Sequence, residues 1–152
     1  MSAVPGIERD VGRELDPASV GALLVCEDLI VDTYARADAG RRYSIADLFE
    51  EDGSHTLADA TVAGREAIRD MLAARDADPS RRTLHVVTNL RSDQVADDRM
   101  HVRYILTLYL LSAPGAGAFV PQSLSAATDV LVRRGDRWLL RSRDVRVLTG
   151  AG

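Results

Sequence analysis

Strand patterns fill the second half of the chain, and they constrain the fold more than any other feature. Apolar, β-branched and aromatic residues recur in four segments, which cover residues 81–96, 100–112, 122–133 and 138–148. Turn-forming residues separate the first two segments at Asp97–Arg99 and the last two at Arg134–Arg137. The sequence therefore predicts a four-stranded antiparallel meander.

Helical patterns precede this meander. Asp16 and Pro17 are typical of a helix start, and apolar residues recur at helical spacing up to about Ala39, before Gly40. They form two adjoining stripes, one of Val20, Leu24, Val31, Tyr34 and Ala35 and one of Leu23, Cys26 and Ile30. Two further helices are expected over 44–53 and 65–75, with short strands at 54–57 and 61–62 between them. Helices segregated from an antiparallel sheet are typical of an α+β domain.

Length and composition fit one domain with a substantial core. The chain has 152 residues, of which 46% are hydrophobic and 28% charged. The net charge of -4, with carboxylates spread along the chain, argues against nucleic acid or an anionic membrane as the main partner. The single cysteine, Cys26, permits no internal disulfide, which is consistent with a cytoplasmic protein.

The chain is expected to contain one folded domain over residues 16–148. Residues 1–15 carry charges of both signs and no apolar run, so we interpret them as a flexible leader and not as a signal peptide. Residues 149–152 are expected to form a tail. No apolar run approaches the roughly 20 residues that a membrane span needs.

One predicted strand, Arg81–Leu90, combines polar chemistry with an apolar face. Successive side chains of a strand point to opposite faces, so His85, Val87 and Asn89 share one face. The other face carries Leu84, Val86, Thr88 and Leu90 and is expected to face the core. A histidine placed in this way can act as a general base near neutral pH. The alternative is a core histidine that is bonded to a backbone carbonyl.

Five short motifs follow one another between Pro17 and Val147. They are Tyr34–Asp38, Leu48–Gly53, Gly64–Ile68, His85–Asn89, and Asp136–Trp138 followed by Arg143. Together they resemble the nuclear transport factor 2-like superfamily, close to its SnoaL-like branch. The resemblance implies a curved antiparallel sheet wrapped over three N-terminal helices, as a cone-shaped barrel with an internal pocket. The superfamily includes dehydratases, polyketide cyclases, ketosteroid isomerases, epoxide hydrolases and dioxygenase small subunits, so the fold does not settle the activity.

The resemblance to the dehydratases implies a catalytic group. The tyrosine late in their first helix maps to Tyr34, the nearby aspartate to Asp38 and the strand histidine to His85. An aspartate bonded to one ring nitrogen raises the basicity of the imidazole, and Tyr34, Asn89 or Tyr109 is the expected donor to a developing enolate oxygen. The alternative is that Asp38 is merely solvated near the helix end. The second pocket histidine of scytalone dehydratase has no counterpart on the following strand.

Further residues are expected at the wall of the pocket. Tyr104 and Tyr109 fall on opposite faces of their strand, and Tyr109 is favoured for the pocket. The substrate-binding candidates are Asn89, Tyr109, Phe49, Val87, His55 and Arg143. For His55 a surface position is the favoured alternative, and for Arg143 a cross-strand ion pair with Asp129. No metal or other cofactor is expected, because His55, His85 and His101 lack ligand spacing and residues 113–118 form no phosphate-binding loop.

We expect a cofactor-independent acid-base enzyme, namely a dehydratase, cyclase or isomerase. Its substrate is expected to be a small, largely apolar molecule such as a polyketide or a steroid-like compound, within secondary metabolism. The alternative is a non-catalytic binding module or the small subunit of a larger oxygenase complex. A homodimer through the outer face of the sheet is also predicted, because an outward apolar patch is expected from Val102, Tyr104, Leu106 and Leu108.

Overall fold

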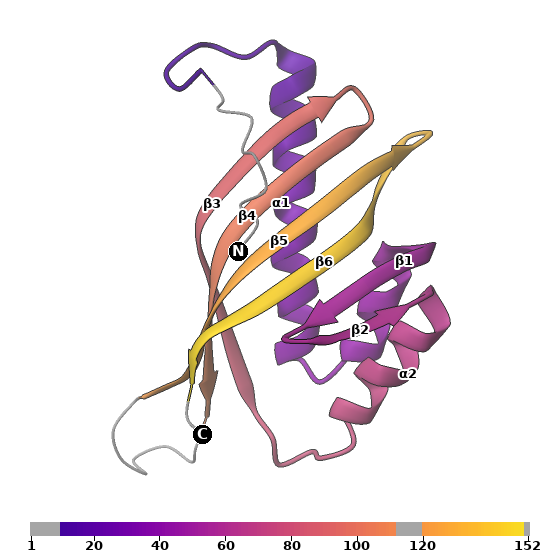
Figure 1. The fold of residues 1–152 in the computed structure, drawn as a ribbon, viewed down its shortest axis with the longest axis vertical. Helices are drawn as coiled ribbons and strands as arrows, with labels where there is room; N and C mark the ends of the chain where they lie inside the picture. The colour runs from indigo at the N-terminus through magenta and orange to yellow at the C-terminus, as the bar shows by residue number, and fades with distance from the viewer. Residues whose placement is uncertain (1–9, 112–119, 151–152) are drawn as a thin grey trace.

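Helices come first in the chain and most of the sheet follows, as predicted. The computed structural model describes residues 10–111 and 120–150, so the leader up to residue 9 and the loop at 113–118 lie outside the described residues. The elements in chain order are α1 (Pro17–Asp38), the 3₁₀-helix η1 (Arg42–Leu48), β1 (Phe49–Leu57), β2 (Ala60–Ala63), α2 (Arg65–Arg75), β3 (Thr83–Ala96), β4 (Arg99–Leu110), β5 (Pro121–Arg134) and β6 (Arg137–Gly150) (Figure 1).

All six strands form one curved sheet in the order β2-β1-β6-β5-β4-β3. The strands β3 to β6 make the predicted antiparallel meander, and β1 joins its far edge by pairing parallel to β6. This arrangement confirms the α+β class and the curved sheet. The cone does not close into a complete barrel, because β2 and β3 lie at opposite edges of the described sheet.

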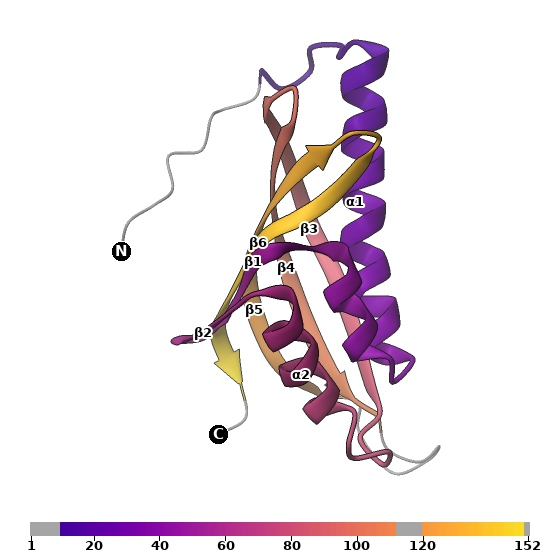
Figure 2. The same ribbon diagram turned by 90° about the vertical axis from the view of Figure 1, so that its right-hand side faces the viewer.

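The helices lie on one side of the sheet (Figure 2). The helix α1 packs against β3 and η1, while α2 packs against η1 and β1. Asp16 begins α1 by accepting a hydrogen bond from the backbone N–H of Ser19, and Gly40 follows its end with φ of 71°. None of the helices in the described part of the chain has the length and apolar character needed to cross a bilayer.

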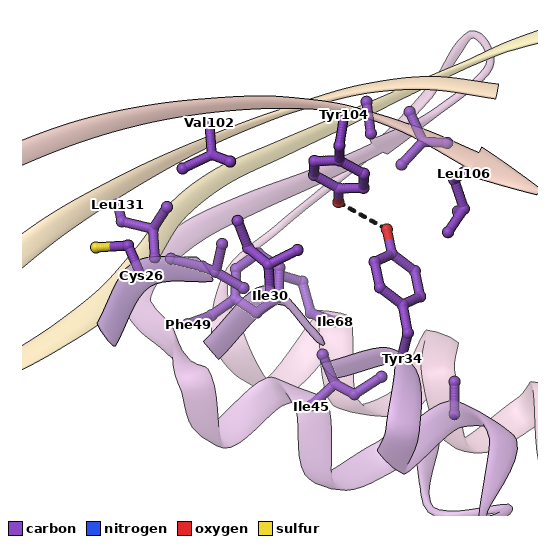
Figure 3. Packing of buried hydrophobic residues seen from close by; sticks show 14 of the residues in the cluster. Cys26, Ile30, Tyr34, Ile45, Phe49, Ile68, Val102, Tyr104, Leu106 and Leu131 are labelled. Carbon is purple, nitrogen blue, oxygen red and sulfur yellow. Dashed lines mark hydrogen bonds between the residues drawn. The ribbon is translucent and has the colours of Figure 1, made fainter. Parts of the chain in front are cut away.

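The core lies between α1 and the inner face of the meander. Tyr34 of α1 points toward Tyr104 of β4, and Cys26 and Ile30 belong to the same buried cluster as Val102 (Figure 3). Cys26 and Ile30 of the second apolar stripe are therefore buried together with Tyr34 of the first, whereas Leu24 of the first stripe is 63% exposed. The predicted helix over 44–53 is replaced by η1, which ends at Leu48, and the following residues belong to β1.

The faces of β3 and β4 differ in part from those expected. Leu84 and Val86, expected in the core, are 39% and 36% exposed on the outer face, while His85 lines the cavity, as its predicted catalytic role requires. On β4 the predicted outward patch is wrong, because Val102, Tyr104 and Leu106 are buried in the core and Leu108 lines a cavity. The homodimer stays a prediction, but these residues cannot form its interface.

Candidate active site

A cavity of about 490 Å³ lies between the helices and the sheet. Its size is typical of pockets that hold small organic molecules. Every helix and most strands contribute to its wall, with Tyr34 from α1, Arg42 from η1, His55 from β1, Arg75 from α2 and His85 from β3. The apolar part of the wall includes Ile45, Leu57, Leu72, Leu106, Leu108 and Val145.

The predicted pair of Asp38 and His85 forms at one side of this cavity. Asp38 ends α1, and its carboxylate reaches the start of β3. One carboxylate oxygen, Oδ1, lies 2.6 Å from His85 Nδ1, and the other accepts the backbone N–H of His85 at 2.9 Å. Because these two bonds hold both the ring and the backbone of His85, the imidazole has a fixed orientation toward the cavity.

A chain of hydrogen bonds supports the carboxylate of Asp38. The hydroxyl of Thr83 donates to Asp38 Oδ1 at 3.1 Å and accepts from Arg42 Nη2 at 2.7 Å. The other terminal nitrogen of Arg42 donates to Asp76 at 2.9 Å, just beyond the end of α2. Hydrogen bonds therefore connect the pair of Asp38 and His85, the dyad, to η1 and α2 as well as to α1 and β3. Neither Thr83 nor Arg42 was among the predicted site residues.

The environment keeps the imidazole of His85 neutral at physiological pH. Burial is the main cause that lowers its pKa from the ordinary value of 6.5, and the bond with Asp38 opposes this effect. The charges of Arg42 and Arg143 lower the pKa further. Since an ionised carboxylate only accepts hydrogen bonds, Nδ1 carries the proton, and Nε2 keeps a free lone pair for a ligand.

The hydroxyl of Tyr34 is engaged away from the dyad. The Tyr34 ring lies 5.2 Å from the His85 ring, centroid to centroid, but its hydroxyl is 2.7 Å from that of Tyr104 (Figure 3). Tyr104 in turn donates to Asp129 Oδ2 at 3.2 Å. Because the proton of Tyr104 goes to the carboxylate, Tyr34 must donate to Tyr104. Tyr34 was an expected donor to an enolate oxygen, but in this arrangement its only proton is already donated to Tyr104. Burial raises the pKa of both phenols, so they stay neutral.

The predicted ion pair of Asp129 and Arg143 is present and fully buried. Arg143 Nη2 and Nε donate to the carboxylate at 2.7 and 2.9 Å, and Nη1 donates to Thr33 at 3.0 Å. The guanidinium carbon lies 4.8 Å from the centroid of the Tyr34 ring, in cation–π geometry. Arg143 also lines the cavity, so it combines the structural role with access to a ligand.

His55 brings a second imidazole into the cavity, contrary to the favoured surface position. Its side chain is in the cavity wall, the residue is only 7% exposed, and its Nδ1 has no hydrogen-bond partner among the described residues. Burial, followed by the charges of Arg143 and Arg75, lowers its pKa to about 3. The ring is therefore neutral at physiological pH. It enters from β1 and not from the strand after His85.

Four of the predicted substrate-binding residues do not line the cavity. Asn89 is exposed with φ of 56°, at a register shift of the β3–β4 pairing that turns it off the inner face. Tyr109 lies on the outer face of β4, while Phe49 and Val87 pack in the core. No group of three or more His, Cys, Asp or Glu within the described ranges could hold a metal ion.

Comparisons with known proteins place this geometry in a family. Residues 26–144 match the family model of the SnoaL-like domain, whereas no curated protein matches the sequence. A candidate scytalone dehydratase from Novosphingobium aromaticivorans has a similar structure, with 19% identity and a TM-score of 0.77 over 90% of this chain and 91% of that one.

Two structures from Streptomyces are similar as well. Aln2 from a Streptomyces species has 19% identity and a TM-score of 0.75, over 89% of this chain and 94% of that one. ActVI-ORFA from Streptomyces coelicolor has 21% identity and a TM-score of 0.74, over 84% of this chain and 98% of that one. Identities this low show a shared fold.

Proposed function

Because this chain belongs to the SnoaL-like domain family, we propose that it is a cofactor-independent acid-base enzyme of the dehydratase or cyclase type. The observation that carries the proposal is the bond of 2.6 Å between Asp38 and His85 Nδ1 at the wall of a cavity of ligand size. The similarity in fold to a candidate scytalone dehydratase supports the same class of reaction. The substrate is a carbonyl compound with an acidic proton next to the carbonyl group.

The proposed reaction begins with removal of that proton by His85 Nε2. The imidazolium that forms is stabilised by the carboxylate of Asp38, as in other aspartate–histidine pairs. In a dehydration the electron pair of the broken C–H bond forms the new double bond. The hydroxyl on the next carbon then leaves as water and takes the proton back from His85. In a cyclisation the enolate carbon attacks a second carbonyl group and forms a C–C bond, and the alkoxide that results takes the proton back from His85.

The residues of the wall suit an enolate intermediate. The neutral imidazole of His55 lies in the wall, and the cation of Arg143 lies near it, since His55 and Arg143 are partners in the β1–β6 register. A ring N–H and a guanidinium are both able to stabilise negative charge that develops on a carbonyl oxygen. The apolar side chains Leu72, Leu106 and Leu108 exclude water and strengthen these interactions.

The proposal is tested with the aldol adduct of benzaldehyde and acetone, a β-hydroxy ketone. Two readouts are followed by NMR, the formation of the enone and the incorporation of deuterium from heavy water next to the carbonyl. We expect His85→Ala to lower both rates by about 10²- to 10⁴-fold. Asp38→Asn should lower them by about 10- to 100-fold, because the ring loses the partner that orients it and raises its basicity.

Matched variants control for unspecific effects. His101→Ala removes a half-exposed histidine of the outer face, and Asp32→Asn removes a half-exposed carboxylate of the same helix as Asp38. Both should keep the wild-type rates. The rate should rise with pH to a plateau, with an inflection below 6.5, since the pKa of His85 is lowered from that value. An unchanged rate in His85→Ala would contradict the proposal.

A further inference from the structure

The charged side chains that line the cavity in the described part of the chain are all basic. They include four arginines, Arg42, Arg75, Arg81 and Arg143, and no aspartate or glutamate. Two of these cations are neutralised by carboxylates that lie behind the wall. Arg42 pairs with Asp76 at 2.9 Å, and Arg143 pairs with Asp129 at 2.7 Å. The other two arginines decide the charge that a ligand would meet.

Arg75 is a half-buried cation without a counter-charge. It lies in the last turn of α2, and its guanidinium makes no hydrogen bond or ion pair within the described ranges. Burial lowers its pKa, and the neighbouring charges of Arg81 and Arg42 lower it further. The end of a helix carries only about half a negative charge, so α2 offsets the cost in part. Burial of an unpaired charge is otherwise unfavourable.

Arg81 adds a second cation on the solvent side of the cavity. It is exposed just before β3, and its guanidinium has no ion pair among the residues described. The nearest acid in the sequence is Asp78, whose Oδ1 accepts from the hydroxyl and backbone N–H of Ser80 at 2.6 and 3.0 Å. The bonds from Ser80 are the main cause that lowers the pKa of Asp78, and the charge of Arg81 is a smaller one, so Asp78 offsets Arg81 only in part. Arg75 and Arg81 thus leave an excess of positive charge where the cavity meets solvent.

We propose that the ligand of this cavity is an organic carboxylate, held by Arg75 and Arg81 while its apolar body lies against Leu72, Leu106 and Leu108. A guanidinium donates two parallel hydrogen bonds to a carboxylate, and this geometry favours carboxylates over neutral polar groups. This inference rests on the proposed function in one respect, namely that the bound carboxylate is also the substrate on which His85 acts. Fixing the carboxylate at the mouth would hold the reacting carbonyl compound in one orientation.

The inference is tested by calorimetric titration with β-naphthoate and with the neutral analogue β-naphthamide, which has the same ring system. The wild-type chain should bind the naphthoate at least about tenfold more tightly. In Arg75→Gln this preference should fall below about threefold, and in Arg81→Gln it should fall by a smaller factor, because Arg81 is more exposed. Arg75→Lys keeps the charge and should keep part of the preference.

Arg99→Gln is the matched control, because Arg99 is an exposed arginine at the β3–β4 turn that does not line the cavity. It should keep the full preference. Thermal unfolding of each variant serves to check that its fold is intact. Equal affinity of the wild-type chain for both probes would overturn the inference, and so would a preference that Arg75→Gln and Arg81→Gln leave unchanged.

A parallel titration of His85→Ala separates this inference from the proposed function. The variant should still prefer the naphthoate, because both arginines are intact. A retained preference together with wild-type rates in His85→Ala supports the carboxylate site and contradicts the catalytic proposal. Equal affinity of the wild-type chain for both probes, with rates that depend on His85, supports the catalytic proposal and contradicts the carboxylate site.

Discussion

Breaking the buried ion pair of Asp129 and Arg143 is expected to destabilise the fold strongly. Asp129 is 0% exposed and accepts hydrogen bonds from Arg143 at 2.7 and 2.9 Å and from Tyr104 at 3.2 Å. In Asp129→Asn the guanidinium stays buried without a counter-charge, which costs about 3–5 kcal/mol. At this chain length each kcal/mol lowers the melting temperature by about 2–4 °C, so a fall of about 6–20 °C is expected.

Urea denaturation measures the free energy of unfolding for this prediction. Asp93→Asn is the matched control, since Asp93 also pairs across two strands, at 3.3 Å, but with an Arg103 side chain that is 46% exposed. The free energy of unfolding of Asp93→Asn should fall by less than about 1 kcal/mol. The double variant Asp129→Leu with Arg143→Met removes both charges and should recover most of the stability. Equal losses for Asp129→Asn and Asp93→Asn would refute the reasoning.

Two further predictions concern His55 and Thr83. The pKa of His55 is about 3 in the fold, against an ordinary 6.5. Between pH 7 and pH 5 this histidine therefore becomes protonated in the unfolded chain but stays neutral in the native fold. The free energy of unfolding should fall by about 2 kcal/mol over this range for that reason. Urea denaturation at both pH values should show that this fall in stability is absent in His55→Phe and present in His101→Phe. Thr83→Val should cost about 1–3 kcal/mol, because Arg42 Nη2 loses its acceptor. Thr88→Val, on the exposed face of the same strand, should change stability by less than about 0.5 kcal/mol, and a similar loss in both would speak against the network.

Local patterns were sufficient for most elements of the fold. The third helix has the predicted bounds, Arg65–Arg75, and the meander strands begin and end within a few residues of the prediction. These segments carry strong periodicity and clear turn residues, which act over short distances along the chain. The contact of Asp38 with His85 could be predicted as well, because helix end and strand start are both marked in the sequence and the family resemblance pairs them.

The alternation of apolar and polar residues could not show which face of β3 and β4 is turned toward the core. On β4 the inner residues Tyr104 and Leu106 alternate with Ile105 and Tyr109 of the outer face, so both faces are apolar and neither is marked as the core. On β3 the register shift after Thr88 moves Asn89 out of line with His85. A bulge of this kind depends on the partner strand, and the sequence of one strand does not reveal it.

The charge of the cavity is a further property that only the tertiary structure reveals. The net charge of -4, taken over the whole chain, argues against nucleic acid or an anionic membrane as the main partner. A ligand, however, meets only the side chains at the wall, and there the arginines face inward while Asp76 and Asp129 stand behind them. Parallel pairing of β1 with β6 completes the arrangement by setting His55 beside Arg143. Because long-range pairing separates these charges in space, a chain that is acidic overall can enclose a basic site.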